Sequence, residues 1–177
     1  TAATPNNKKT ICQRIQKLDA TGVETGAAGP SVAVRLANAG RRTAIIERQR
    51  FGGTCVNSGC IPTKTLIASA RAAYIARRAA DFGVTIEGRV RVDMARVKAR
   101  KDDVVQHANG GVVSWLRNTP NLTVFEGHGR FVSSCKVRIN GRILDAGDVF
   151  VDFGSGASVP DIPGLVDTGG MTNPGTL

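Results

Sequence analysis

The segment from Gly52 to Lys64, Gly-Gly-Thr-Cys-Val-Asn-Ser-Gly-Cys-Ile-Pro-Thr-Lys, constrains this chain more than any other feature. Its cysteines, Cys55 and Cys60, have four residues between them, but no second pair of ligands with the spacing of a zinc site accompanies them. Pro62 suits the first turn of a helix, and the positive end of a helix lowers the pKa of a nearby thiol. The segment therefore predicts a redox pair that opens and closes as a disulfide at the start of a helix.

The patterns around this segment predict an α/β fold. Residues 31–39 have helical spacing and precede Gly40, and the apolar run 43–47 suits a buried parallel strand. We expect two further helices, over 65–81 and over 93–117, the second interrupted or bent near Gly110-Gly111.

From Leu122 onward the period changes to that of strands. Short alternating runs at 123–126, 130–132, 136–139 and 148–152, with a turn at Asn140-Gly141, predict a small antiparallel β-meander. Residues 1–17 are polar, so we expect a frayed or disordered N-terminus followed by one domain over 18–177.

Charge and hydropathy limit the classes of function. The net charge is +10, but the basic residues are spread along the chain and only one Trp and one Tyr accompany them, so we expect no nucleic-acid platform. A basic surface also steers anionic cofactors towards a protein. The sequence has no run of about 18 apolar residues and no apolar segment behind its N-terminal charges, so we expect no membrane span, no secretory signal and a cytoplasmic location.

The Gly52–Lys64 segment resembles the active-site segment of the class I flavin- and pyridine-nucleotide-dependent disulfide oxidoreductases. This family includes dihydrolipoamide dehydrogenase, glutathione reductase and mercuric reductase, and the runs Val56-Asn57 and Ile61–Leu66 are most similar to the mercuric-reductase-like branch. The resemblance covers about residues 18–173 and implies a Rossmann-like FAD-binding domain. Family chains continue into an NAD(P)-binding domain and a C-terminal interface domain that forms a homodimer. We therefore expect this chain to be about the first third of such an enzyme.

The resemblance also implies a reaction. NAD(P)H reduces FAD, FAD reduces the Cys55–Cys60 disulfide, and the thiolates reduce a small-molecule disulfide or Hg(II), a soft ion that two thiolates bind well. Cys60 is implied as the thiol facing the flavin and Cys55 as the interchange thiol, with Lys64 near the flavin N5 edge. Because the family's acid–base histidine comes from the interface domain of a partner subunit, we expect this chain alone to be inactive or nearly so.

The expected FAD site departs from the family at its phosphate loop. A dinucleotide loop reads Gly-x-Gly-x-x-Gly, but here Glu24 replaces the first glycine before Gly26 and Gly29, and the strand at 19–23 has little to bury. Glu47, 18 residues past Gly29, suits the adenosine ribose. The full set of residues implied to bind the cofactor is Gly26, Gly29, Glu47, Arg48, Gly52, Gly53, Thr54, Lys64, His128, Gly129 and Gly154.

Two interpretations remain open from the sequence. The first is the FAD domain of a mercuric-reductase-like oxidoreductase. The alternative is a truncated, non-catalytic thiol protein with a degenerate flavin loop, which Glu24, the weak first strand and Phe153 in place of a family threonine favour. The sequence does not separate Hg(II) from lipoamide, glutathione or another disulfide, nor NADH from NADPH.

Overall fold

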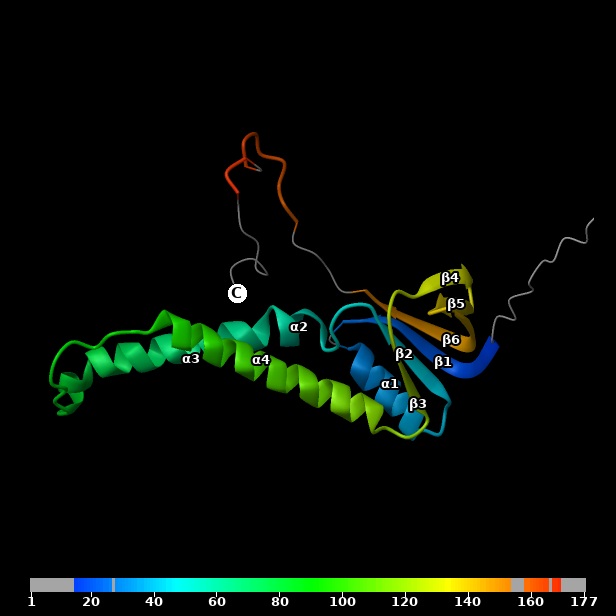
Figure 1. The fold of residues 1–177 in the computed structure, drawn as a ribbon, viewed down its shortest axis with the longest axis horizontal. Coiled ribbons are helices and arrows are strands. Elements are labelled where there is room, and N and C mark those ends of the chain that lie inside the picture. The colour runs from blue at the N-terminus through cyan, green and yellow to red at the C-terminus, as the bar shows by residue number, and fades with distance from the viewer. Residues whose placement is uncertain (1–14, 27, 154–157, 166, 170–177) are drawn as a thin grey trace, which may run out of the picture.

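A computed structural model of the chain describes residues 15–26, 28–153, 158–165 and 167–169. The elements follow one another as β1 (Ile15–Thr25), α1 (Gly29–Asn38), β2 (Thr43–Glu47), α2 (Gly53–Asn57), α3 (Cys60–Arg77), the short 3-10 helix η1 (Ala79–Phe82), α4 (Met94–Arg117), β3 (Leu122–Glu126), β4 (Arg130–Ser133), β5 (Lys136–Ile139) and β6 (Arg142–Asp152). Figure 1 shows this order from blue to red.

The strands form one six-stranded sheet in the order β3-β2-β1-β6-β5-β4. The neighbours β3, β2, β1 and β6 are parallel, whereas β6, β5 and β4 are antiparallel. The expected turn at Asn140-Gly141 is confirmed, and both residues have the positive φ of a tight hairpin (46° and 74°). The expected membership of 123–126 in the meander is wrong. These residues form β3, which pairs in parallel with β2 because the intervening helices return the chain in the same direction.

Strand β1 lies in the middle of the sheet, between β2 and β6, and its pairing with β6 runs from Ile15 to Thr25. It includes the last three residues, 15–17, of the segment that we expected to be frayed. The expectation of a poor strand at 19–23 is also wrong, because backbone partners on both sides and the small size of Ala20 and Thr21, both fully buried, suit a central position.

The sheet has an apolar cluster on each face, because successive side chains of a strand point to opposite sides. In β2, Ala44 and Ile46 belong to one cluster, with residues of β1, β3, β5 and β6. Ile45 belongs to the other cluster, where α1 and α4 cover the sheet through Val34 and Leu116. Burial on both faces explains why β2 reads as a continuous apolar run.

Helices α3 and α4 lie side by side and project away from the sheet as a long hairpin (Figure 1). Helix α4 begins after Asp93, whose side chain accepts a hydrogen bond from the Arg96 amide (3.1 Å), and it continues through Gly110-Gly111. The expected interruption there does not occur. No helix in the described part of the chain is both long enough and apolar enough to cross a membrane.

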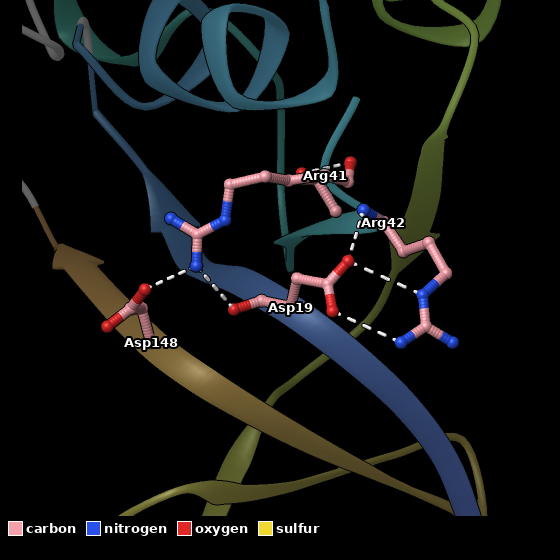
Figure 2. Close-up of polar contacts among 5 residues, drawn as sticks. Asp19, Arg41, Arg42 and Asp148 are labelled. Atoms are coloured by element: carbon pink, nitrogen blue, oxygen red, sulfur yellow. Dashed lines mark hydrogen bonds and ion pairs between the residues drawn. The ribbon is translucent and has the colours of Figure 1, made fainter. Parts of the chain in front are cut away.

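A charged cluster connects the middle of β1 and of β6 to the two residues that precede β2 (Figure 2). The Arg41 guanidinium donates to the Asp19 carbonyl (2.8 Å) and contacts the Asp148 carboxylate, which links β1, β6 and the residues before β2. Arg42 donates to the Asp19 carboxylate from its backbone amide (2.8 Å) and from its guanidinium (3.1 Å). The side-chain hydrogen bond from Arg42 lowers the pKa of Asp19, so this aspartate stays ionised in the folded chain.

Candidate active site and cofactor-binding loop

The two cysteines of the predicted redox pair lie together. Cys55 is in the short helix α2 and is half-buried, whereas Cys60 is exposed and is the first residue of α3. Both thiols are free, and they lie close enough for Cys60 to influence the titration of Cys55. The interaction with Cys60, helped by partial burial, raises the pKa of the Cys55 thiol above its usual value, and the Lys64 charge opposes the shift. The structure therefore places the two thiols near each other across the turn from α2 to α3, with the Lys64 charge close enough to act on Cys55.

Backbone geometry explains the glycines of this segment. Gly52 and Gly53 have φ of 95° and 58°, a left-handed conformation that favours glycine. A Cβ on Gly52 would lie 2.7 Å from the Val56 side chain, and one on Gly59 would lie 2.9 Å from the carbonyl oxygen of Thr54. These glycines let the chain turn from β2 into α2 and from α2 into α3, which brings the cysteines together.

An amide network holds the cysteine segment against α4. Asn57, between the two cysteines, donates to the carbonyl oxygens of Phe51 (3.0 Å) and Gly53 (2.9 Å). Asn109 of α4 donates to the same Phe51 oxygen (2.6 Å) and to the Asn57 side-chain oxygen (3.0 Å). Our sequence analysis missed Asn109, because no local pattern marks a residue that meets its partner 52 positions away.

The other expected residues of this segment lie on the same helices. Lys64 is exposed on α3, one turn past Cys60, and Thr54 is exposed on α2. Next to them, Arg100 of α4 donates to the Thr65 carbonyl oxygen (3.0 Å) and so connects the second turn of α3 to α4. The start of α3 is thus held from the α4 side, while Lys64 remains open to solvent.

The predicted phosphate loop runs from the end of β1 into α1. Its Gly26 amide donates to the Asp152 carbonyl oxygen (2.9 Å), and its Gly29 amide donates to the Asp152 carboxylate (3.0 Å). A Cβ on Gly26 would lie 2.6 Å from that carboxylate. The backbone of Glu24 is in β1. The carboxylate that meets the start of α1 is that of Asp152, which the sequence analysis did not single out.

Glu47 ends β2 beside this loop and is buried, with 8% of its surface exposed. Its carboxylate accepts a hydrogen bond from the Gln49 amide (2.8 Å), and the next residue, Arg48, is exposed. The Glu47 carbonyl oxygen accepts from the Gly127 amide (2.8 Å), so the segment carrying His128 and Gly129 begins next to Glu47. Gly154 lies outside the described residues.

These positions fit a dinucleotide in most respects. Parallel α/β sheets bind nucleotides at the carboxyl ends of their strands, where the loop glycines, Glu47 and the His128 segment lie. An acidic residue after the second strand suits a ribose, and amides at the start of α1 suit a phosphate. One feature does not fit: the Gly29 amide already donates to the Asp152 carboxylate, so a phosphate could use this amide only after that side chain moves away.

Comparison with known proteins agrees with this arrangement. The sequence model of the family "Pyridine nucleotide-disulphide oxidoreductase" matches residues 25–175. The chain is 37% identical over 140 residues to a dihydrolipoyl dehydrogenase of Acholeplasma laidlawii, covering 79% of this chain and 41% of the relative. It is 35% identical over 152 residues to the dihydrolipoyl dehydrogenase of Chlamydia trachomatis, covering 84% of this chain and 32% of the relative.

A solved structure shows the same relationship. The copper(II) complex of the HOCl-induced flavoprotein disulfide reductase RclA from Escherichia coli superposes with a TM-score of 0.69 at 32% identity, covering 85% of this chain and 32% of that one. The chain thus spans between about a third and two fifths of the length of these proteins. The predicted α/β fold is confirmed, as is FAD with NAD(P)H as the cofactor set of the family. The mercuric-reductase-like branch is not singled out by these matches. This chain belongs to the pyridine nucleotide-disulfide oxidoreductase family.

Proposed function

We propose that this chain is the FAD-binding part of a flavoprotein disulfide reductase that uses Cys55 and Cys60 to pass electrons from NAD(P)H to a disulfide or to Hg(II). The observation that carries the proposal is the placement of Cys55 in α2 and Cys60 at the start of α3, on either side of one tight turn, in the segment that leaves β2 just after Glu47. Family membership supports an oxidoreductase over the alternative of a non-catalytic thiol protein.

Each part of the cofactor can be matched to residues of this chain. Gly26 and Gly29 would face the phosphates, Glu47 the ribose, and the backbone at His128-Gly129 the adenine. Gly52, Gly53 and Thr54 would meet the rest of the cofactor, with Lys64 near its reactive edge. When bound, FAD supplies the route by which two electrons from NAD(P)H reach the disulfide.

The thiol chemistry then balances without further groups from this chain. The Cys55–Cys60 disulfide takes up two electrons and two protons and becomes two thiols. The Cys55 thiolate attacks one sulfur of a substrate disulfide, which forms a mixed disulfide and releases one substrate thiolate. The Cys60 thiolate then attacks Cys55 Sγ, which restores the Cys55–Cys60 disulfide and releases the second substrate thiolate. Those two thiolates take up the two protons.

The raised pKa of Cys55 supports a need for a base during turnover. At neutral pH the Cys55 thiol keeps its proton, so attack on a substrate needs a base to remove it. We propose that the base is the acid–base histidine of the family's C-terminal interface domain, in an intact homodimer. The 177 residues alone are therefore expected to undergo thiol–flavin electron exchange but little turnover.

The proposal also concerns the class of substrate, which is either a disulfide or Hg(II). The relatives named above support a disulfide, whereas the runs Val56-Asn57 and Ile61–Leu66 support Hg(II), for which two adjacent thiolates are suitable ligands. We also infer a cytoplasmic location, since disulfides in the cytosol are usually transient and catalytic, as proposed here for Cys55 and Cys60. Reoxidation of the reduced, FAD-loaded chain by Hg(II), lipoamide or glutathione disulfide, each added anaerobically, separates these substrates, and cell fractionation tests the location.

A visible absorption spectrum tests the proposal. The purified chain is mixed with FAD, freed of excess cofactor, and recorded before and after addition of dithiothreitol. We expect a bound-flavin band that gains a long-wavelength shoulder on thiol reduction and loses that shoulder in Cys60→Ser, with Cys135→Ser as the matched control. A flavin band without any response to thiol reduction would contradict the role of the pair, and a shoulder that survives in Cys60→Ser would reverse the two cysteine assignments.

A further inference from the structure

We propose that the Asp152 carboxylate is an internal competitor for the cofactor phosphates, so that FAD loading requires this side chain to leave the start of α1. The inference rests on the proposed FAD-binding function and goes beyond it, because it assigns control of loading to a residue outside the glycine loop. In the cofactor-free chain, the amides of Gly26 and Gly29 donate to Asp152 instead of to a ligand.

The geometry places Asp152 at the centre of the loop. Its backbone carbonyl accepts from the Gly26 amide (2.9 Å), and its carboxylate accepts from the Gly29 amide (3.0 Å), the first residue of α1. The carboxylate also fills the space beside Gly26, where an added Cβ would lie 2.6 Å from one oxygen and 2.8 Å from the other. One residue thus contacts both glycines that would face the phosphates.

The described residues at the start of α1 supply no anion of their own, so Asp152 is the one that meets the helix amides. Within the described residues, α1 has no acidic side chain in its first turn, and Ala28 before it offers no capping side chain. The amides and the positive end of a helix favour an anion there. A carboxylate that accepts an amide hydrogen bond is a favourable substitute, so Asp152 supplies from β6 what the chain near α1 lacks.

The same preference of the helix start for an anion makes Asp152 compete with the cofactor phosphates. A pyrophosphate at the start of α1 would need the Gly29 amide that Asp152 now occupies, and its negative charges would repel the carboxylate at close range. Removing the carboxylate should therefore change two properties in opposite directions. It should weaken the cofactor-free fold and strengthen FAD binding. An ordinary helix cap would instead weaken both, since a loosened α1 binds phosphate less well.

Two variants at position 152 and one control test this inference on the whole chain. Asp152→Asn keeps the shape and an acceptor oxygen but removes the charge, and Asp152→Ala removes both. Asp145→Asn makes the same charge change on β6, where Asp145 faces Lys136 (3.5 Å) rather than α1. FAD affinity is measured by titration of flavin fluorescence, cofactor-free stability by thermal melting, and the Gly29 contact by hydrogen exchange of its amide.

We expect both Asp152 variants to bind FAD about tenfold more tightly than wild type, and Asp145→Asn to bind like wild type. Asp152→Ala should melt at a lower temperature without FAD and exchange the Gly29 amide faster. If wild type binds FAD but the Asp152 variants bind equally or more weakly, the competition is refuted while the proposed function stands. If none of the four proteins binds FAD, the proposed function itself fails and the inference with it.

Discussion

Replacing Asn109 with alanine should loosen the redox segment without touching either cysteine. The substitution removes two hydrogen bonds, to the Phe51 carbonyl oxygen (2.6 Å) and to the Asn57 side-chain oxygen (3.0 Å). A single such bond contributes about 0.5–1.5 kcal/mol net. The Phe51 oxygen keeps the hydrogen bond from Asn57, and solvent reaches the half-buried Asn57, so neither acceptor becomes fully orphaned. We therefore expect a loss of about 1–2 kcal/mol in the free energy of unfolding, in the lower half of the two-bond range.

Urea denaturation followed by circular dichroism measures this loss, and Asn118→Ala is the matched control. Asn118 follows the same helix, is exposed, and donates one side-chain hydrogen bond, to the Ser114 hydroxyl (3.2 Å), so its replacement should cost less than about 0.5 kcal/mol. Alkylation of Cys55 at constant pH adds a local readout, since a looser segment exposes the thiol more often. Equal stability of the Asn109 and Asn118 variants would refute the idea that the amide network holds the segment.

Three further predictions address the core and the titrating groups. Leu116→Ala removes a fully buried side chain from the cluster under α1 and should cost about 2–5 kcal/mol in urea denaturation, and a loss below about 1 kcal/mol would show that this cluster is not packed as described. Cys60→Ala removes the main cause of the raised Cys55 pKa, so the pH midpoint of Cys55 alkylation, followed on its peptide by mass spectrometry, should fall, and an unchanged midpoint would contradict the thiol contact. Asp102 is hydrogen-bonded by Lys101 and Lys98, which lowers its pKa to about 2, so it adds stability above the ordinary aspartate pKa that disappears as the pH falls towards 2. The melting-temperature difference between wild type and Asp102→Asn should therefore be constant from about pH 5 to 8 and shrink below about pH 4, and a difference that persists at pH 2 would contradict this assignment.

The redox segment could be predicted from the sequence because its geometry is local. The glycines and the two cysteines act within a few residues of one another, so a short motif contains most of the information, but not the hydrogen bonds that Asn109 adds from 52 positions away. The sheet was predicted less well. The alternation at 123–126 shows a strand but not its partner, and only the return of the chain along α4 makes it pair in parallel with β2. Likewise, the small side chains at 19–23 predicted a weak strand, whereas a central position in the sheet favours small residues.

The nucleotide loop illustrates the limit of local patterns most clearly. Its two glycines are adjacent to α1 in sequence, but the carboxylate that meets the Gly29 amide comes from a residue 123 positions later. Sheet topology explains the encounter: β1 and β6 are parallel neighbours, and their register pairs Thr25 with Asp152 at the ends of both strands. The carboxyl end of β6 therefore meets the start of α1 whatever residue stands at position 152. A small side chain at position 152 would leave the Gly29 amide free to bind a ligand, whereas the Asp152 carboxylate accepts its hydrogen bond. Position 152 thus lies beside the proposed phosphate loop in space, so glycine spacing alone does not describe all the groups that a bound phosphate would meet there.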